Sequence, residues 1–345
     1  MALNRVDRLL AGYLGFVTLI IVVRGPFSSR ANAWMFGMHL LFGAMLYLYT
    51  RLGPTDRLGR AMHVLYPIAM LLPFYTQIGF LNAALDPDTV FAHDAVIQGW
   101  EDAIFGSQIS YTWIRNKPSV FWSGLLHLGY TSYYPIAALG PILLVLRGRE
   151  SDATAVVLAT MVAFVVCYVV FVLYPVAGPN YAFEPPTGPV REVWSARLVY
   201  GMLAGGSAFG TAFPSSHVAA STAATLMLWR VWRPLAALFA LPLVLLIIGT
   251  VYCQMHYGID ASTGLIVGIL ATYVAAKWHK EPQRAQSLPP TFLFFLLFEF
   301  DERGGWGVHQ RKALCVLCGL CGQKKAAHAQ RRRLYQPGTS SVIRS

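Results

Sequence analysis

The sequence predicts an all-α fold, a polytopic bundle of about six to eight helices that cross a membrane. Of the 345 residues, 56% are hydrophobic and only 12% are charged, whereas soluble domains carry about 25% charged residues. Apolar stretches recur along the chain, and most reach or approach the roughly 20 residues that a helix needs to cross the hydrocarbon core. They cover residues 9–23, 33–50, 62–84, 120–146, 153–174, 215–229, 234–252 and 257–277. We take all eight as spans, although the first and the sixth are short.

The predicted helices divide the chain into three parts. Residues 1–61 form an N-terminal helical pair, residues 62–279 a catalytic membrane domain, and residues 280–345 a basic cytoplasmic tail that we expect to be partly disordered. From residue 277 onward, 12 Lys and Arg stand against 4 Asp and Glu, so that +8 of the net charge of +11 lies there. A basic tail that leaves a membrane span typically contacts anionic lipid heads. Membrane lipids, and not nucleic acid, are therefore the expected partners, while the oligomeric state is open.

Loop charge predicts the orientation of the chain. The loops after the second, fourth and sixth stretches contain arginines, and such loops face the cytoplasm; these are Arg51, Arg57, Arg60, Arg147, Arg149, Arg230 and Arg233. Both termini then lie in the cytoplasm, and we expect the membrane to be the inner membrane of a cell. The loops on the other side, 85–119 and 175–213, are long. Loops of this length without regular structure are usually functional.

The first stretch could instead be a secretory signal, since Ala31-Asn32-Ala33 follows it. Arg24 and Arg30 lie between the apolar core and that tripeptide, which disfavours cleavage. The orientation of the other spans is the same in either case.

Two histidines stand where apolar stretches meet polar sequence. His217 follows Pro214-Ser215-Ser216 at the start of the sixth stretch, and His256 opens the eighth. On a helix, Asp260 lies one turn from His256 on the same face. Its carboxylate can take the proton of one imidazole nitrogen and leave the other nitrogen as a nucleophile. The predicted orientation places both histidines on the extracytoplasmic side.

This pattern predicts phosphoryl transfer on a lipid phosphoester at the outer face of the membrane. His256 is the expected nucleophile, which forms a phosphohistidine, and Asp260 orients it and stabilises its cationic form. His217 is the expected general acid for the leaving alkoxide and then the base for the acceptor. Ser215 and Ser216 begin a helix, so that their hydroxyls and N–H groups can hold phosphate oxygens. The reaction needs no cofactor and no metal.

Two alternatives remain open. His217, His256 and Asp260 could be ligands of a zinc ion that activates water, which would make the protein a zinc-dependent hydrolase. A non-catalytic lipid transporter is less compatible with histidines at helix ends, because transporters usually place ionisable groups near the middle of the membrane. In the tail, Cys315, Cys318 and Cys321 have the spacing of a metal site, with His309 and His328 nearby, but such a site would need a fourth ligand and a folded frame.

At these residues the sequence resembles the type-2 phosphatidic acid phosphatase superfamily. Members carry Pro-Ser-Gly-His, matched here by Pro214 to His217 with Ser216 in place of Gly, and a later Ser-Arg-x5-His-x3-Asp motif whose end matches His256 and Asp260. The resemblance covers roughly residues 60–280 and implies a helical catalytic core like that of these phosphatases. It implies either phosphatase or phosphotransferase activity.

Where this sequence differs from the superfamily motifs, it resembles one branch of the superfamily, the inositol-phosphorylceramide-synthase-like proteins. These proteins are inositolphosphotransferases. Gly249-Thr250 stands where Ser-Arg is expected, and Thr250-Val251-Tyr252 is similar to the branch. Asp94 and the run from Glu101 to Gly106 also resemble it. The branch implies transfer of a phospho-headgroup to a lipid hydroxyl. With the usual phosphate-binding Arg missing, Arg191 and Arg197 are the candidates that precede His217 within the family's range of spacing.

Overall fold

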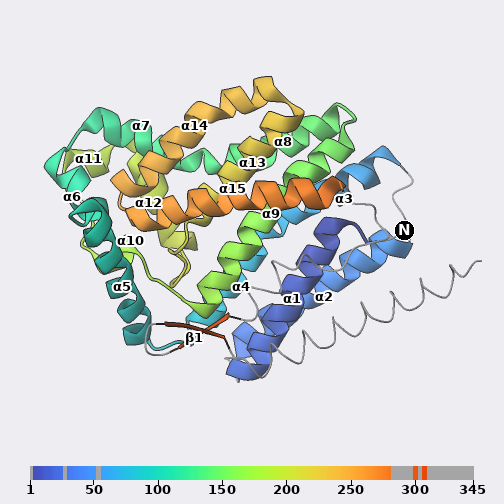
Figure 1. Ribbon diagram of the computed structural model, residues 1–345, viewed down its shortest axis with the longest axis horizontal. Helices are drawn as coiled ribbons and strands as arrows, with labels where there is room; N and C mark the ends of the chain where they lie inside the picture. The colour runs from blue at the N-terminus through green and yellow to red at the C-terminus, as the bar shows by residue number, and fades with distance from the viewer. Residues whose placement is uncertain (1–2, 26–28, 52–55, 281–297, 302–304, 309–345) are drawn as a thin grey trace, which may run out of the picture. The chain divides into compact units, whose positions relative to one another are not determined.

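The computed structural model describes residues 3–25, 29–51, 56–280, 298–301 and 305–308. Contacts divide the chain into two units, Met1–Ala285 and Gln286–Ser345. Within the second unit the described residues form an antiparallel pair of strands, β1 (Phe298–Asp301) and β2 (Gly305–Val308), with Phe298 opposite Val308. Most of the predicted basic tail, with its three cysteines, lies outside the described residues. All other elements belong to the first unit and are helices (Figure 1).

Four helices precede the region of the two histidines. They are α1 (Arg5–Arg24), α2 (Ser29–Arg51), α3 (Arg57–Ala69) and α4 (Leu71–Asn82). Asn4 and Asp7 form a capping box at the start of α1, in which each side chain accepts a hydrogen bond from the other residue's N–H. Helices α3 and α4 follow one another with a break only at Met70, and together they form one apolar segment long enough to cross a membrane.

The expected loop 85–119 is helical in the structure. It contains α5 (Pro87–Phe105) and α6 (Ile109–Asn116). Asp86 caps α5, Pro87 occupies its first turn, and Gly106 ends it in a left-handed conformation with φ of 73°. The prediction of irregular structure was wrong here because the segment contains many polar residues, although Val90, Asp94, Ile97 and Glu101 of α5 are buried at helical spacing. The loop 175–213 likewise contains α10 (Pro179–Ala182), α11 (Pro189–Glu192) and α12 (Trp194–Gly206).

The remaining helices form the centre of the unit. They are α7 (Val120–Thr131), α8 (Tyr133–Leu146), α9 (Glu150–Leu173), α13 (Ser216–Val231), α14 (Arg233–Tyr252) and α15 (Gly258–Lys280). Helices α9, α13 and α15 pack on one another, and α14 packs on α7 and α13 (Figure 1). Helix α13 is enclosed by these neighbours, and most of its residues are buried. The site described below lies at its first turn.

Glycines let α13 and α15 approach closely. A Cβ atom on Gly264 would lie 2.5 Å from the carbonyl oxygen of Ser215, and one on Gly268 would lie 2.5 Å from the carbonyl oxygen of Ala219. Both distances are far shorter than a van der Waals contact. This spacing of small residues is a frequent means of close helix packing in membranes. It fixes the start of α13 directly against α15.

The predicted membrane bundle is confirmed. Six helical segments among the described residues are long and apolar enough to cross a membrane, and α7 with α8, bent by 42° at their junction, would make a seventh. Each of the eight predicted stretches coincides with helix. The sixth stretch forms α13, whose 16 residues are short for a span. The protein is therefore an integral membrane protein.

Candidate active site

His217 lies in the first turn of α13. Ser215 is the N-cap of this helix, and its side chain accepts a hydrogen bond of 3.4 Å from the N–H of Val218. Pro214 is the last residue of the segment that connects α12 to this cap. His217 is therefore the second residue of α13. The predicted helix start at Pro-Ser-Ser is present as expected.

His256 lies in a tight turn between α14 and α15. The carbonyl oxygen of Thr250 accepts hydrogen bonds from the N–H groups of Met255 (3.0 Å) and His256 (2.9 Å). Gln254 adopts a φ of 60°, a conformation that is uncommon for residues other than glycine. Its buried side-chain amide donates to the carbonyl oxygens of Pro179 (3.2 Å) and Glu184 (3.0 Å), and the turn is thereby held against α10.

The structure brings the two histidines together. The centroids of the His217 and His256 rings are 5.9 Å apart, and the rings are inclined at 59°. Tyr133 packs edge-on against His217 with a centroid distance of 4.5 Å, and Tyr130 lies 5.2 Å from it. Both imidazoles line one pocket, although 38 residues separate them in the sequence.

A main-chain carbonyl orients His256. Its Nδ1 lies 3.0 Å from the oxygen of Ala212 and 3.5 Å from Oδ2 of Asp260. A carbonyl oxygen can only accept, so Nδ1 carries the proton and Nε2 keeps its lone pair. Burial lowers the pKa of His256 to about 4, a shift that the hydrogen bond to Ala212 opposes. At neutral pH the imidazole is therefore uncharged and nucleophilic.

Asp260 is fully buried in the first turn of α15. Its Oδ2 accepts a hydrogen bond of 2.8 Å from the N–H of Tyr257, and no described residue donates to its Oδ1. The carbonyl oxygen of Asp260 accepts from the N–H of Ser215 at 3.0 Å. Asp260 therefore ties the start of α15 to the cap of α13, and its carboxylate stands beside His256 without being its nearest hydrogen-bond acceptor.

The pocket around the histidines has a volume of about 40 Å³ and is lined mainly by small and hydroxylated residues. The lining comprises Tyr75, Tyr130, Ala177, Asn180, Tyr181, Leu203, Ser207, Ala208, Thr211, Ala212, Ser216, His217, Met255 and His256. Among the described residues, no Lys or Arg side chain lines it. A negatively charged group bound here would meet hydroxyl and amide donors and the positive end of α13.

The predicted phosphate-binding residues take different positions. Ser216 lines the pocket, whereas Ser215 is buried and serves as the helix cap. Arg191 lies over the ring of Tyr200, with its guanidinium carbon 4.7 Å from the ring centroid. Arg197 lies exposed on α12. Neither arginine is part of the pocket wall in this conformation.

Asp94, on α5, connects two parts of the site. Its carboxylate accepts hydrogen bonds from the N–H groups of Ala177 (2.7 Å) and Gly178 (2.8 Å) and from the hydroxyl of Tyr257 (2.9 Å). Burial raises the pKa of Asp94, and these three donors counteract that shift. Sequence reasoning assigned Asp94 no role beyond its resemblance to the branch. The available signal was an acidic residue with apolar neighbours at helical spacing.

Glu101, seven residues later on the same helix, holds the start of α15. Its Oε2 accepts from the N–H of Gly258 at 2.7 Å, and its Oε1 accepts from the N–H of Ser110 at 3.2 Å. Burial raises the pKa of Glu101, while the main-chain donors lower it. The carboxylate satisfies N–H groups that the first turn of a helix leaves free. Asp94 and Glu101 are thus buried carboxylates that support the site.

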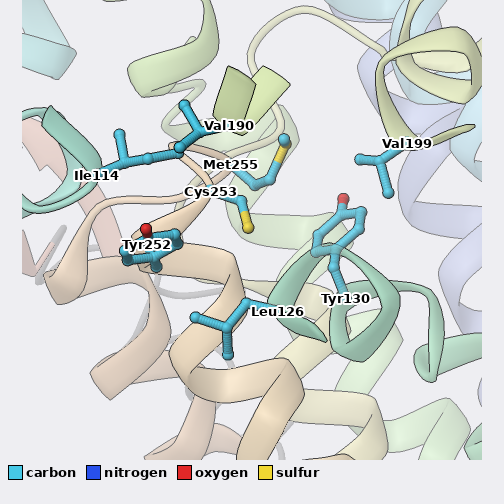
Figure 2. Close-up of a cluster of buried hydrophobic side chains, with 8 residues drawn as sticks. All are labelled: Ile114, Leu126, Tyr130, Val190, Val199, Tyr252, Cys253 and Met255. Atoms are coloured by element: carbon cyan, nitrogen blue, oxygen red, sulfur yellow. The ribbon is translucent and has the colours of Figure 1, made fainter. Parts of the chain in front are cut away.

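A cluster of buried side chains anchors the other side of the turn. Cys253 and Met255 pack among Leu126, Tyr130 and Val199, and Figure 2 shows these side chains converging from separate segments. Because Tyr130 also contacts His217, the cluster connects the two histidine-bearing segments. The cluster therefore holds the start of α13 against the turn that carries His256.

The described residues include no group of three His, Cys, Asp or Glu side chains arranged to hold a metal ion. His217, His256 and Asp260 are close, but the zinc alternative finds no ligand set in this part of the chain.

Comparison with known protein families gave one match. The profile of the PAP2 superfamily matches residues 100–274, which include His217, His256 and Asp260. The chain belongs to the PAP2 superfamily. This confirms the predicted superfamily, whose members are phosphatases and phosphotransferases, and makes the protein a membrane enzyme of phosphatase type. The comparisons with curated proteins and with solved structures gave no match.

Proposed function

We propose that the protein cleaves a lipid phosphoester at the outer face of the membrane through a phosphohistidine on His256. One observation supports this above all. The rings of His217 and His256 line one pocket, and their centroids are 5.9 Å apart. The hydrogen bond from His256 Nδ1 to the carbonyl oxygen of Ala212 leaves Nε2 as the free nucleophile. A nucleophile and a second proton carrier on either side of a phosphate are what this reaction requires.

The proposed reaction has two steps. In the first, Nε2 of His256 attacks phosphorus, the bond from phosphorus to the leaving oxygen breaks, and His217 gives that oxygen a proton. In the second, water or a lipid hydroxyl attacks the phosphohistidine, its proton passes to His217, and the phosphorus–nitrogen bond breaks. The buried carboxylate of Asp260 stabilises the cationic ring of His256 between the steps. Neither step needs a cofactor.

Phosphate oxygens would be held by the first turn of α13. Ser216 lines the pocket at that turn, where free N–H groups and the helix dipole favour an anion. Ser215 contributes through the geometry of the cap. Arg191 and Arg197 remain the candidates for positive charge, and each would have to turn toward the pocket when substrate binds.

The absence of Lys and Arg from the described pocket wall favours a second candidate function, the transfer of a phospho-headgroup from one lipid to another. A phosphomonoester carries up to two negative charges, and a phosphodiester carries one. Moving charge out of water costs several kcal/mol per ion unless an opposite charge compensates. A wall without Lys or Arg among the described residues therefore suits a phosphodiester better. This agrees with the resemblance to inositolphosphotransferases, in which a lipid hydroxyl accepts the phospho-headgroup.

The side of the membrane is proposed from loop charge. Arginine-rich loops mark the cytoplasmic side, so that the site faces away from the cytoplasm and both termini lie inside, with the inner membrane as the expected location. A lipid substrate is expected because the pocket lies within a membrane bundle.

Substrate and mechanism are tested together on the purified full-length chain. Phosphate release from lipid phosphomonoesters is compared with headgroup transfer from phosphodiester lipids to diacylglycerol or ceramide, with EDTA in a parallel set. His256→Ala should reduce the active reaction by about 10³-fold or more. His39→Ala, on α2, is the matched control and should retain activity. Activity lost with EDTA would support the zinc-dependent alternative.

The intermediate is tested separately by trapping. Substrate labelled in the phosphate should transfer label to the wild-type protein, and the adduct should be labile in acid and stable in base, as a phosphoramidate is. A label that persists in His256→Ala, or an acid-stable adduct, would overturn the assignment of His256.

A further inference from the structure

We propose that a groove between α2 and α4 binds an anionic phospholipid, at a site separate from the pocket of the two histidines. The groove has a volume of about 460 Å³ and is lined by Arg30, Ala33 and Trp34 of α2 and by Thr76 and Phe80 of α4. This volume can hold a lipid headgroup and the first part of its acyl chains. Arg30 can pair with the negatively charged headgroup of a phospholipid, and the rings of Trp34 and Phe80 can contact its acyl chains.

The positive charge lies at the end of α1 and the start of α2. Arg30 lines the groove, and Arg24 ends α1 five residues before α2 begins. Arg24 donates from Nη2 to the carbonyl oxygen of Val172 at 2.6 Å, whereas its Nη1 is buried without a hydrogen-bond partner among the described residues. Such positive charge at the membrane surface attracts anionic lipid heads, at about 1 kcal/mol per residue.

The apolar part of the groove continues along both helices. The rings of Trp34 and Phe80 lie next to each other, 6.2 Å apart between centroids and inclined at 53°. One turn further along α2 is Gly37, where a Cβ would meet no atom within 4 Å. One turn back along α4 from Thr76 is Leu72, which is 70% exposed. An acyl chain that leaves a headgroup at Arg30 would therefore find open space at Gly37 and an apolar surface at Leu72.

Successive residues of α4 face the two cavities. Tyr75 lines the pocket of the two histidines, and Thr76 lines the groove, so that both cavities lie at the same height along α4. The groove lies entirely before residue 100, where the match to the PAP2 superfamily begins. It is therefore a property of this chain's N-terminal helices and does not depend on the proposed reaction.

Binding is tested with the full-length protein in detergent. Phosphatidylglycerol should bind saturably and raise the melting temperature more than phosphatidylcholine does. Arg30→Gln should weaken the binding of phosphatidylglycerol about fivefold, which corresponds to about 1 kcal/mol. Lys117→Gln removes a cation from an exposed position at the end of α6 and should bind the lipid as the wild type does.

A second variant tests the path of the acyl chain. Gly37→Leu fills open space, so it should fold normally yet reduce the binding of phosphatidylglycerol. Inorganic phosphate and glycerol 3-phosphate are added as headgroup-only probes and should give little stabilisation. Equal stabilisation by the two phospholipids, wild-type binding in both groove variants, or full stabilisation by inorganic phosphate would overturn the proposal. Because the active-site residues are unchanged, none of these results would bear on the proposed reaction.

Discussion

The carbonyl oxygen of Ala212 lies 3.0 Å from Nδ1 of His256, closer than Oδ2 of Asp260, which lies 3.5 Å from the same nitrogen. The main chain thus fixes which nitrogen of His256 carries the proton. In a triad of the serine-protease type a carboxylate has this task. Here Asp260 is free to act mainly through its charge, on the positive ring of the proposed phosphohistidine. Loss of a carboxylate that sets the tautomer should impair the enzyme much more severely than loss of one that only stabilises the positive ring.

We expect Asp260→Asn to lower kcat by about 10- to 100-fold, as the loss of a supporting partner does. Asparagine keeps the shape of the side chain, and Ala212 keeps the tautomer of His256, but the negative charge is gone. The measurement is steady-state kinetics of whichever reaction is active, with KM expected to change little. A fall of about 10⁴-fold, as when a carboxylate sets the tautomer, would show that Asp260 and not Ala212 orients the ring.

The dependence of activity on pH should reflect the lowered pKa of His256. An ordinary histidine has a pKa of about 6.5, whereas burial lowers that of His256 to about 4. The nucleophilic, neutral form should therefore persist in acid, so that the acidic limb of kcat/KM should lie near pH 4 and not near 6.5. A phosphodiester substrate should be used, because its charge is constant over this range.

The same shift affects folding. Between pH 6.5 and 4 the unfolded chain binds a proton at this histidine and the folded chain does not, so stability falls as the pH falls through that window. Circular dichroism at each pH is the control that the enzyme is still folded. An acidic limb of kcat/KM centred near pH 6.5 in folded protein would contradict the prediction.

How far the sequence could predict this molecule depends on the kind of signal. Apolar runs were sufficient to predict the membrane spans, because spans must bury their backbone polar groups in helical hydrogen bonds. The pairing of His217 with His256 followed from topology, since both stand at helix ends on one side. The role of Ala212 could not be predicted, because a main-chain carbonyl contact leaves no mark on side-chain identity. The place of Tyr75 in the pocket wall could not be predicted either, because Tyr75 belongs to a helix outside the segment that matches the family.

The buried acids were missed for another reason. Asp94 and Glu101 lie in a segment rich in polar residues, where charge normally indicates solvent exposure. Their burial depends on N–H donors more than 80 residues away in the sequence, such as that of Gly258. Arg191 and Arg197 show the reverse case, since their spacing from His217 suited a phosphate site but neither lines the pocket.

Glu101→Gln should lower both stability and kcat. Each oxygen of the Glu101 carboxylate accepts from a different main-chain N–H, those of Ser110 and Gly258. An amide has only one acceptor oxygen, so that one of these N–H groups would face an NH₂ group instead. Loss of a hydrogen bond to a charged group costs about 1.5–3 kcal/mol.

The start of α15 would loosen in this variant, and with it the position of Asp260. Melting temperature and kcat are measured beside those of Asp102→Asn, which changes an exposed neighbour on the same helix and should leave both quantities unchanged. Equal values for the two variants would show that Glu101 does not support the site.

Gly264→Ala should separate the two helices that carry the site. The new Cβ would lie 2.5 Å from the carbonyl oxygen of Ser215, so that α13 and α15 must shift apart. Overpacking of this kind typically costs about 1–3 kcal/mol. The hydrogen bond of 3.0 Å from the N–H of Ser215 to the carbonyl oxygen of Asp260 spans the same contact and should weaken with it.

Gly201→Ala is the matched control for this substitution. Gly201 lies exposed on α12, and a Cβ there would meet no atom within 4 Å. In a helix this replacement alone should stabilise the protein by up to about 1 kcal/mol. The melting temperature should therefore fall in Gly264→Ala and hold or rise in Gly201→Ala, with activity lost only in the first. If both variants melt and react alike, the close approach of α13 and α15 is not what holds His217 and Asp260 in register.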